Sequence, residues 1–380
     1  MKSFTIISSY SLQEPVLKNR VQPFIVLLLE SGYKVTLVSP SGGALDIDNL
    51  PGFSHVQVDI QGRGNKGFLG RALYEARLAR QLLKVGEGFE NTFSLITIPS
   101  MFLLFLFSFP SKINILDLRD LTWEYLDDRK WFTRFAKVLF RRLAKIKINK
   151  IDLILVTNKT EFEFVTAALN VPHEKVIHVS NGVSRSQFEA LSPSNISHST
   201  SLPVRISYIG NVGVAQNLSI FLAAAKELPS VEFYIVGDGT DFSHVNSQAK
   251  AMGLKNVFFT GRVAWVDIPK YYSDTHILYS QLSSEFSGAM PSKLYEYLAT
   301  GKFIIYGGEG QAESILREFS NNLVVPPNNA KDLISAIQNV IDLSEWNTLS
   351  LSNRNMVSEL YIREDRVNVF VEKIKGMASE

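Results

Sequence analysis

The stretch VRISYIGNVG at residues 204–213 decides how the chain folds. Val204–Ile209 is a short β-branched and aromatic run, typical of a buried strand, and a helical pattern begins near Asn217. Gly210 and Gly213 occupy the turn between them. Glycines let a backbone approach an anion closely, and a helix start adds partial positive charge. The stretch therefore predicts a strand, a tight turn and a helix, and the turn is either a phosphate site or only a connection.

The same alternation of short apolar runs and helical patterns continues along the whole chain. Near-continuous apolar strands are typical of parallel sheets that carry helices on both faces. The pattern predicts an α/β protein with two Rossmann-like domains. The twelve runs expected to form strands are Phe4–Ile7, Val35–Val38, Leu95–Ile98, Ile113–Leu118, Leu153–Thr157, Val176–Val179, Val204–Ile209, Glu232–Val236, Val257–Thr260, Ile277–Ser280, Phe303–Tyr306 and Leu323–Val325.

The length of 380 residues suits two domains better than one core. Residues 184–201 contain seven serines and Pro193 with little apolar periodicity, which is typical of a linker. We expect an N-terminal domain at residues 1–190, a linker at 191–203 and a C-terminal domain at 204–350. A helix is expected at 351–380, and its pattern leaves open whether it crosses back to the first domain. Two such domains would face each other across a cleft that holds the chemistry.

Composition narrows the class of protein. Hydrophobic residues make up 46% and charged residues 20%, which favours a globular chain, and the absence of cysteine excludes disulfides and thiolate chemistry. It is compatible with a reducing cytoplasm. The N-terminal MKSFTIISSYSLQ predicts a first strand and not a signal peptide, and Met101–Phe109 is too short to span a bilayer and is expected to be a buried helix.

Other common sites are not indicated. The six histidines show no metal-ligand spacing, so no metal site and no cofactor are expected. Gly62–Gly67 matches G-x-G-x-x-G, but it does not follow the first strand, and no acidic residue ends the next one. We expect a basic loop there. Neither a G-x-S-x-G elbow nor a Walker loop is present, which argues against hydrolases and P-loop proteins.

A second candidate site is SGAMPSKLYEYLATGK at residues 287–302. Pro291 suits the first position of a helix, and Gly301 suits its end. Lys293 would add a full charge to the free N–H groups of that helix start. Glu296 could accept hydrogen bonds from sugar hydroxyls, although Lys293 and Glu296 could equally form a surface ion pair.

These segments resemble glycosyltransferase family 4, the retaining transferases built from two Rossmann-like domains. The Pro-Ser-Lys-Leu-Tyr-Glu-Tyr form at residues 291–297 resembles the bacterial branch that transfers acetamido-deoxyhexoses such as N-acetylfucosamine during surface-polysaccharide synthesis. The segments that carry the resemblance are Tyr208–Gly213, Tyr234–Gly239, Val257–Val263 and Pro291–Gly301, with Asp117–Leu121 and Val179–Val183 in the first half.

The resemblance implies a nucleotide diphosphate-sugar donor with UDP as the expected nucleotide, retention of anomeric configuration and no metal requirement. Glu296 would hold the ribose, and Val263 would lie against the base. Met290 and Ser292 would complete the donor site. The diphosphate would be framed by Gly210, Gly213, Arg262 and Lys293.

Several positions depart from the family pattern. The acidic residue expected eight positions before Glu296 is Gly288, and Glu285 is the nearest substitute. Asn211 and Gln216 stand where the family has Arg and Lys, so Arg262 and Lys293 would neutralise the leaving diphosphate. In the first half, Asp120 is expected to stabilise the oxocarbenium ion or position the acceptor. A salt bridge between Arg119 and Asp120 is the structural alternative.

Residues 130–150 carry eight basic and no acidic residues. Phe132, Phe135, Leu139, Leu143 and Ile146 form one helical stripe, and Arg134, Lys137, Arg141 and Lys145 form another. Two interpretations stay open: a core-packed helix with a solvated basic face, or a helix that docks on anionic lipid. Nucleic-acid binding is not expected, because no aromatic platform accompanies the charge.

The sequence thus predicts a cytoplasmic glycosyltransferase that extends a glycan or lipid-linked glycan, and attachment to the inner membrane face follows only from the lipid-docking interpretation of residues 130–150. Two alternatives share the architecture: a nucleotide-sugar epimerase, and a nucleotide-sugar-binding partner protein without activity.

Overall fold

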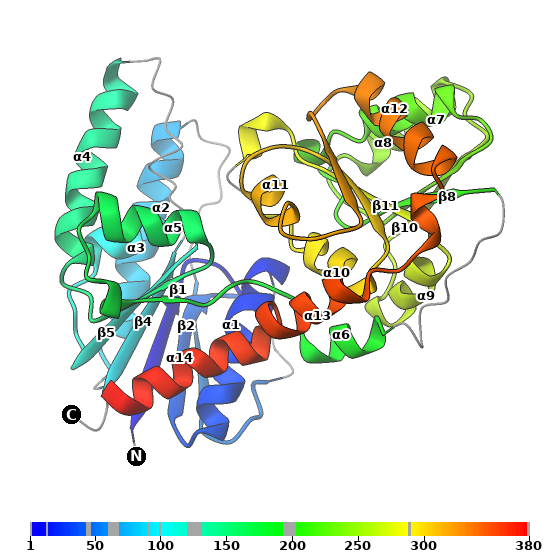
Figure 1. Cartoon of the computed structure of the whole chain (residues 1–380). Helices are drawn as coiled ribbons and strands as arrows, with labels where there is room; N and C mark the ends of the chain where they lie inside the picture. The colour runs from blue at the N-terminus through cyan, green and yellow to red at the C-terminus, as the bar shows by residue number, and fades with distance from the viewer. Residues whose placement is uncertain are drawn as a thin grey trace. The chain divides into compact units, whose positions relative to one another are not determined.

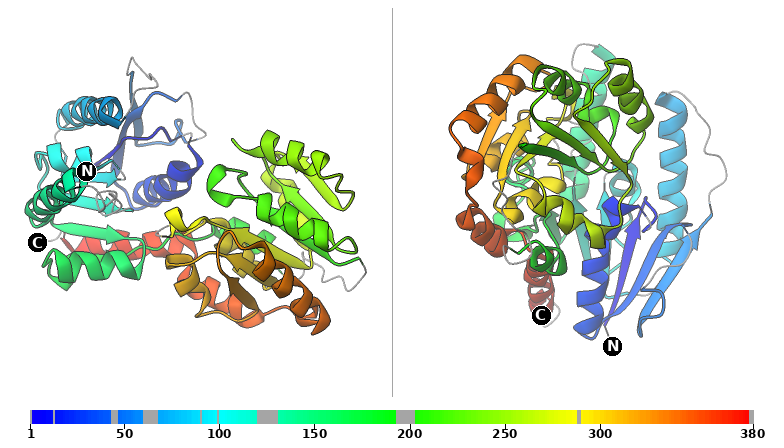
Figure 2. Two further views of the ribbon diagram at one scale, coloured as in Figure 1. Left: turned by 90° about the horizontal axis from the view of Figure 1, so that it is seen from above. Right: turned by 90° about the vertical axis from the view of Figure 1, so that its right-hand side faces the viewer.

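The computed structural model describes residues 2–12, 14–42, 47–59, 68–89, 91–98, 100–119, 131–192, 203–287 and 290–377. Asp120, Gly288, Gly62–Gly67 and most of the expected linker lie outside these residues. The chain forms two compact units, one of Met1–Asn181 with Arg363–Glu380 and one of Gly182–Ile362. Each unit is one parallel sheet with helices on both faces (Figures 1 and 2).

The first unit has a seven-stranded sheet in the order β3-β2-β1-β4-β5-β6-β7. Its strands are β1 (Ser3–Ser8), β2 (Lys34–Pro40), β3 (Phe53–Val58), β4 (Phe93–Ile98), β5 (Ile113–Leu118), β6 (Leu153–Val156) and β7 (Val176–His178). Its helices are α1 (Pro15–Glu30), α2 (Phe68–Gly86), α3 (Met101–Leu106), α4 (Trp131–Ile148), α5 (Lys159–Glu163) and α14 (Arg363–Met377).

The second unit has a six-stranded sheet in the order β10-β9-β8-β11-β12-β13. Its strands are β8 (Arg205–Ile209), β9 (Glu232–Val236), β10 (Val257–Gly261), β11 (Ile277–Gln281), β12 (Phe303–Gly307) and β13 (Asn322–Val325). Its helices are α6 (Arg185–Ala190), α7 (Ser219–Glu227), α8 (Phe242–Ala251), α9 (Ile268–Ser273), α10 (Lys293–Thr300), α11 (Gln311–Leu316), α12 (Ala330–Asp342) and α13 (Leu351–Leu360).

Alternate side chains of the central strands enter different cores, which is why these strands are mostly apolar. In β1, Phe4 and Ile6 join the core under α1 and α14, whereas Ile7 joins the core under α2, α3 and α4. All twelve runs predicted from the sequence form strands. A thirteenth, β3, is an edge strand that carries His55 and Gln57, so it lacks the continuous apolar run used to find the others.

The final helical pattern breaks into two helices at Tyr361–Ile362. Helix α13 stays in the second unit, and α14 returns to the first, where it lies beside α1 (Figure 1). The two crossings of the chain are adjacent, because Val183 pairs with Ile362 and the Val183 N–H donates to Tyr361 O at 3.0 Å. Gly182 is required there, since a Cβ would stand 1.9 Å from Tyr361 O.

Three expectations about boundaries need correction. Residues 185–190 form α6, which begins with a capping box at Ser184 and belongs to the second unit, although the serine-rich composition suggested a linker and the first domain was expected to reach residue 190. Residues 351–380 are two helices and not one. Pro291 lies before the helix, because α10 starts at Lys293 with Ser292 as its N-cap.

Met101–Phe109 was expected to be a buried helix, but α3 ends at Leu106, and only Leu103 and Leu104 are buried in it, while Leu106 is 45% exposed. No helix in the described part of the chain has both the length and the apolar content to cross a membrane.

Helix α14 supplies a substantial part of the core of the first unit. Phe370 is fully buried, and its ring packs against Phe4 and Phe24 with centroids 6.1 and 5.1 Å away. We predict that Phe370→Ala lowers the free energy of unfolding of this unit by about 3–5 kcal/mol, the usual cost of a cavity left by a buried phenyl ring. Val369→Ala, at an exposed neighbouring position, is the control. Denaturant unfolding with hydrogen exchange of β1 measures both, and unchanged protection of β1 in Phe370→Ala would contradict this packing.

Candidate functional site

The candidate donor site is built at the carboxyl end of β8. The strand ends at Ile209, and Gly210 follows at φ 150°, a conformation that L side chains rarely adopt. A Cβ on Gly210 would lie 3.1 Å from Lys293 Cδ and 3.3 Å from Lys293 Nζ. The backbone angle therefore favours glycine at position 210, and a side chain there would also press on the Lys293 side chain from α10.

Helix α10 is fixed to β8 by one buried hydroxyl. Tyr297 Oη accepts a hydrogen bond from Ile209 N at 2.8 Å and lies 3.1 and 3.2 Å from the carbonyl oxygens of Ile209 and Tyr279, which share its proton. The helix ends at Gly301 with φ 72°, as the sequence predicts. The Ser292 side chain makes no capping bond, so the positive end of the helix dipole is not satisfied by its own N-cap side chain.

The Lys293 ammonium begins a short chain of hydrogen bonds. It lies over the Tyr208 ring, 3.6 Å from the centroid, and donates to Tyr208 Oη, which donates to the carbonyl oxygen of Asn211. Burial lowers the pKa of Lys293 well below its usual value, and the negative charge of Glu296 offsets this only in part. Burial also raises the pKa of Tyr208 well above the usual range, so it remains a phenol.

The backbone of the turn after β8 is already paired, which the glycines did not predict. Gly210 N–H donates to Val236 O at 2.8 Å, Val212 N–H to Asp238 O at 3.0 Å, and Gly213 N–H to Gln216 Oε1 at 3.0 Å. These three N–H groups already have acceptors within the protein, so they could bind a phosphate only if these hydrogen bonds were broken. The charge of Lys293 and the start of α10 are the stronger attractions for a phosphate here.

Three glycines let the strand ends lie close together. Gly237, at φ 140°, has no room for a Cβ, which would stand 1.9 Å from Gly210 O. Its N–H donates to Gly261 O at 3.0 Å. Arg262 follows Gly261 and is exposed, and Glu285 is exposed on the short 3-10 helix Ser284–Phe286. Within the described residues, no hydrogen bond joins Arg262 or Glu285 to another candidate.

The residues expected around the base and ribose lie on one apolar cluster. Val263 and Met290 are half-buried against a core that includes Tyr272 and Leu294. Glu296 accepts a hydrogen bond from Tyr272 Oη at 2.9 Å. The structure therefore brings Glu296, Lys293, Gly210, Val263 and Met290 onto one end of the second unit, with Ser292 exposed beside them.

Sequence reasoning missed the residue that holds the turn in place. Gln281 is buried at the end of β11, and its Nε2 donates to the carbonyl oxygens of Gln216 and Asn217, each at 3.1 Å. Its Oε1 accepts from Tyr279 Oη at 2.9 Å. A polar residue that ends an otherwise apolar strand run was the available signal.

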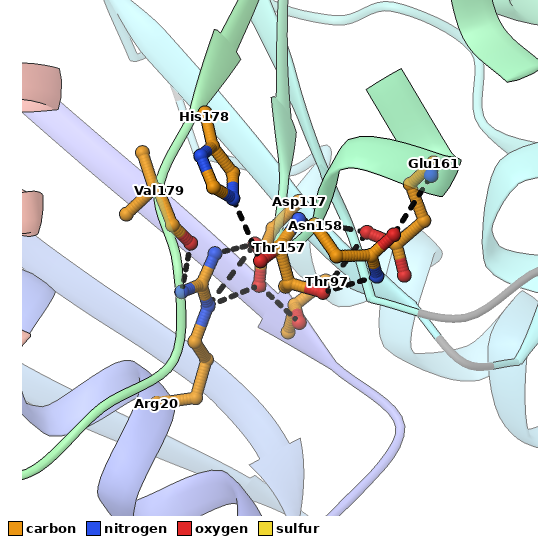
Figure 3. Close-up of polar contacts among 8 residues, drawn as sticks. All are labelled: Arg20, Thr97, Asp117, Thr157, Asn158, Glu161, His178 and Val179. Carbon is orange, nitrogen blue, oxygen red and sulfur yellow. Dashed lines mark hydrogen bonds and ion pairs between the residues drawn. The ribbon is translucent and has the colours of Figure 1, made fainter. Parts of the chain in front are cut away.

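The first unit has its own buried polar cluster at the carboxyl ends of its strands (Figure 3). Arg20 of α1 makes an ion pair with Asp117 at 2.6 Å and donates to Val179 O at 2.7 Å. Thr97 donates to the other Asp117 oxygen at 2.9 Å. Through these bonds Arg20 and Asp117 join the ends of β4, β5 and β7. Removal of one member of such a buried ion pair typically lowers the free energy of unfolding by about 3–5 kcal/mol. Asp120, which lies three residues beyond Asp117, is outside the described residues.

Figure 3 also shows Glu161 beside this cluster. Glu161 is buried and accepts from Thr157 N at 2.7 Å and Thr157 Oγ1 at 2.9 Å, while its own N–H donates to Asn158 Oδ1. Burial raises its pKa to about 7, although the hydrogen bonds from Thr157 oppose the shift. On the next strand, burial lowers the pKa of His178, whose Nε2 lies 2.9 Å from Thr157 O.

No group of three His, Cys, Asp or Glu suited to a metal ion occurs among the residues that the structure describes.

Comparison with known proteins gives the fold of the chain and one family model that matches part of it. A family model described as "Glycosyl transferases group 1" matches residues 199–354. Sucrose-phosphate synthase from Thermosynechococcus elongatus matches with a TM-score of 0.73 and 13% identity over 100% of both chains. The two units have the GT-B fold of glycosyltransferases. No curated protein sequence matches the chain.

Two further GT-B structures match nearly the whole chain. Anabaena HepE in complex with UDP-glucose has a TM-score of 0.68 and 15% identity, over 99% of this chain and 100% of that one. WaaG, a glycosyltransferase involved in lipopolysaccharide biosynthesis, has a TM-score of 0.65 and 12% identity, over 97% and 99%. At these identities the structures establish the fold, and the family match in the second unit supports sugar transfer as the kind of reaction.

We predict that Glu161→Gln removes a pH dependence of stability. Between its ordinary pKa of 4.5 and its folded value of about 7, the folded state holds a proton that the unfolded state has lost. The contribution of Glu161 to the free energy of unfolding is therefore complete below pH 4.5 and is lost as the pH rises through 7, a change of about 3 kcal/mol in all.

Denaturant unfolding from pH 5 to 7.5 should show the free energy of unfolding of wild type falling relative to that of Glu161→Gln. Glu163→Gln, at an exposed position, should follow wild type. Parallel curves for wild type and Glu161→Gln would contradict the raised pKa.

Proposed function

We propose that this protein is a retaining glycosyltransferase that moves a sugar from a UDP-sugar to a glycan or lipid-linked glycan acceptor. Lys293 carries the proposal: a half-buried lysine at the start of a helix, with Gly210 beside its side chain. The choice of UDP draws on the HepE structures, which contain UDP, UDP and glucose, or UDP-glucose. The resemblance at residues 291–297 suggests an acetamido-deoxyhexose such as N-acetylfucosamine as the sugar.

The second unit offers three features that suit a leaving diphosphate. As the bond between the anomeric carbon and the diphosphate breaks, negative charge grows on the diphosphate oxygens. The Lys293 ammonium and the start of α10 stabilise this charge more strongly than that of the intact donor. An anion beside Lys293 also favours its protonated form, which burial alone disfavours. Arg262, exposed just after the end of β10, is the second cation proposed to act on this charge.

In the proposed reaction the acceptor hydroxyl oxygen bonds to the anomeric carbon on the face from which the diphosphate departs. The bond between the anomeric carbon and the diphosphate oxygen breaks, and its electron pair stays on the diphosphate. An oxygen of that diphosphate takes the proton of the acceptor hydroxyl. No metal ion and no protein general base are required. Glu296 binds the ribose hydroxyls, Val263 and Met290 lie against the base, and Asp120 positions the acceptor.

The biological setting proposed is bacterial cell-surface polysaccharide synthesis, for lipopolysaccharide or capsule, in the cytoplasm. It draws on WaaG and on the lipopolysaccharide outer core galactosyltransferase WaaB, which shares the fold with a TM-score of 0.66 and 12% identity over 99% of both chains. A labelled UDP-sugar panel incubated with a bacterial lipid extract tests the reaction. Label should move into the lipid fraction. Label that stays on the nucleotide with an altered sugar would indicate an epimerase, and donor binding without turnover would indicate an inactive partner protein.

We predict that Lys293→Ala lowers turnover by a factor of roughly 100 or more, because the ammonium acts on charge that develops as the leaving group departs. Steady-state assays with saturating donor measure this change. Lys270→Ala, which removes an exposed lysine from α9, should retain wild-type turnover. Activity of Lys293→Ala within twofold of wild type would remove Lys293 from the reaction.

A separate prediction concerns affinity for the nucleotide. Glu296→Gln keeps the shape of the side chain and removes the charge that would accept the ribose hydroxyls, so UDP affinity should fall by about tenfold. Titration calorimetry with UDP measures it, and Glu227→Gln, at an exposed carboxylate at the end of α7, is the control that should bind as wild type does. An unchanged dissociation constant in Glu296→Gln would refute the ribose role.

A further inference from the structure

Helix α4 carries a face of large apolar side chains on the surface of the first unit. Trp131 is 82% exposed, Phe135 65% and Ile146 58%. The exposed apolar side chains of this helix are Trp131, Phe135, Val138, Leu139, Leu143 and Ile146, here called the α4 face. The first interpretation of residues 130–150 placed their apolar stripe in a protein core. Four residues of that stripe are exposed, so this interpretation is wrong for them: Phe135, Leu139, Leu143 and Ile146.

A different side of α4 attaches it to the protein. Ala144 and Ile148 are fully buried in the core under α3, and Phe140 stacks on Phe105 with ring centroids 5.7 Å apart. Lys147 Nζ donates to Phe107 O at 2.8 Å. These contacts attach α4 to the core through residues outside the α4 face, so they do not account for the exposed apolar side chains of that face.

The helical repeat places the two apolar surfaces opposite each other. At about 100° per residue, Trp131, Phe135 and Ile146 lie within about 60° of one another. The buried Ala144 and the half-buried Phe140 lie on the far side of the helix axis. Single exposed apolar residues are ordinary on protein surfaces, but a contiguous patch marks an interaction site.

The charge that α4 itself carries is of one sign. Residues 130–150 hold eight of the 39 basic residues of the chain and none of the 37 acidic ones, which leaves 31 basic against 37 acidic residues elsewhere. Arg134, Arg142 and Lys145 are exposed on the described helix. A basic helix on an otherwise acidic protein favours a partner that is both apolar and anionic.

We propose that the α4 face docks on an anionic lipid bilayer, with α4 lying in the plane of the interface. Its aromatic and aliphatic side chains enter the boundary between headgroups and acyl chains, and the lysines and arginines contact lipid phosphates. A second copy of the chain fits less well, because symmetric pairing of this face would bring two sets of like charges together. The inference goes beyond the proposed function and stands without it, since it concerns binding and not sugar transfer.

Vesicle co-sedimentation tests the proposal with the full-length protein. Wild type should bind vesicles of 30% phosphatidylglycerol in phosphatidylcholine, and should bind pure phosphatidylcholine vesicles at least about tenfold more weakly. The double variant Phe135→Ser/Ile146→Ser should lose at least about tenfold of its affinity for the anionic vesicles. Leu73→Ser/Leu343→Ser, which removes two equally exposed apolar residues from α2 and the end of α12, should bind as wild type does. Thermal unfolding of each variant checks that the fold is intact.

A second variant separates charge from apolar contact. Arg134→Gln/Arg142→Gln/Lys145→Gln should weaken binding at low salt, and the loss should shrink as salt screens the wild-type attraction. Binding of Phe135→Ser/Ile146→Ser equal to that of wild type would overturn the proposal. So would absence of wild-type binding to anionic vesicles at low salt, or a dimer in sedimentation that Phe135→Ser/Ile146→Ser dissociates.

Discussion

The contact between α10 and the end of β8 is the constraint on which the donor site depends. Tyr297 holds the helix against Ile209 through one buried hydroxyl, which brings the first residue of the helix, Lys293, onto Gly210 and Tyr208. Any larger residue at position 210 would meet the Lys293 side chain. A helix start, a lysine with a lowered pKa and a paired backbone turn therefore form one unit, and displacement of one of them would displace the others.

The fold could be predicted from sequence because its central strands are buried on both faces, and even the edge strands β7, β10 and β13 contain short apolar runs. The exception, β3, has polar side chains at an edge. The break between α13 and α14 could not be predicted, because periodicity shows which residues face a core but not which core they face. Phe370 and Val357 have the same apolar pattern, yet they fill cores of different units.

The site was predicted in its residue types but not in its hydrogen bonds. Glycines in the turn suggested free N–H groups, whereas neighbouring strand ends and Gln216 already accept from those of Gly210, Val212 and Gly213. Arg20 illustrates a signal that was present and not used. Arg20 shares the helical face of the buried Leu17 and Phe24 of α1, which implies a buried partner, but only the three-dimensional fold shows that the partner is Asp117. Long-range polar pairs leave no periodic trace in a sequence.

A crystal structure with UDP bound tests the central claim most directly. The account predicts a pyrophosphate beside Gly210 and the start of α10, with Lys293 Nζ about 2.7–2.9 Å from a phosphate oxygen. The Tyr297 contacts to Ile209 should remain unchanged. A diphosphate bound elsewhere on the protein, or one that leaves the Lys293 ammonium solely on Tyr208, would contradict it.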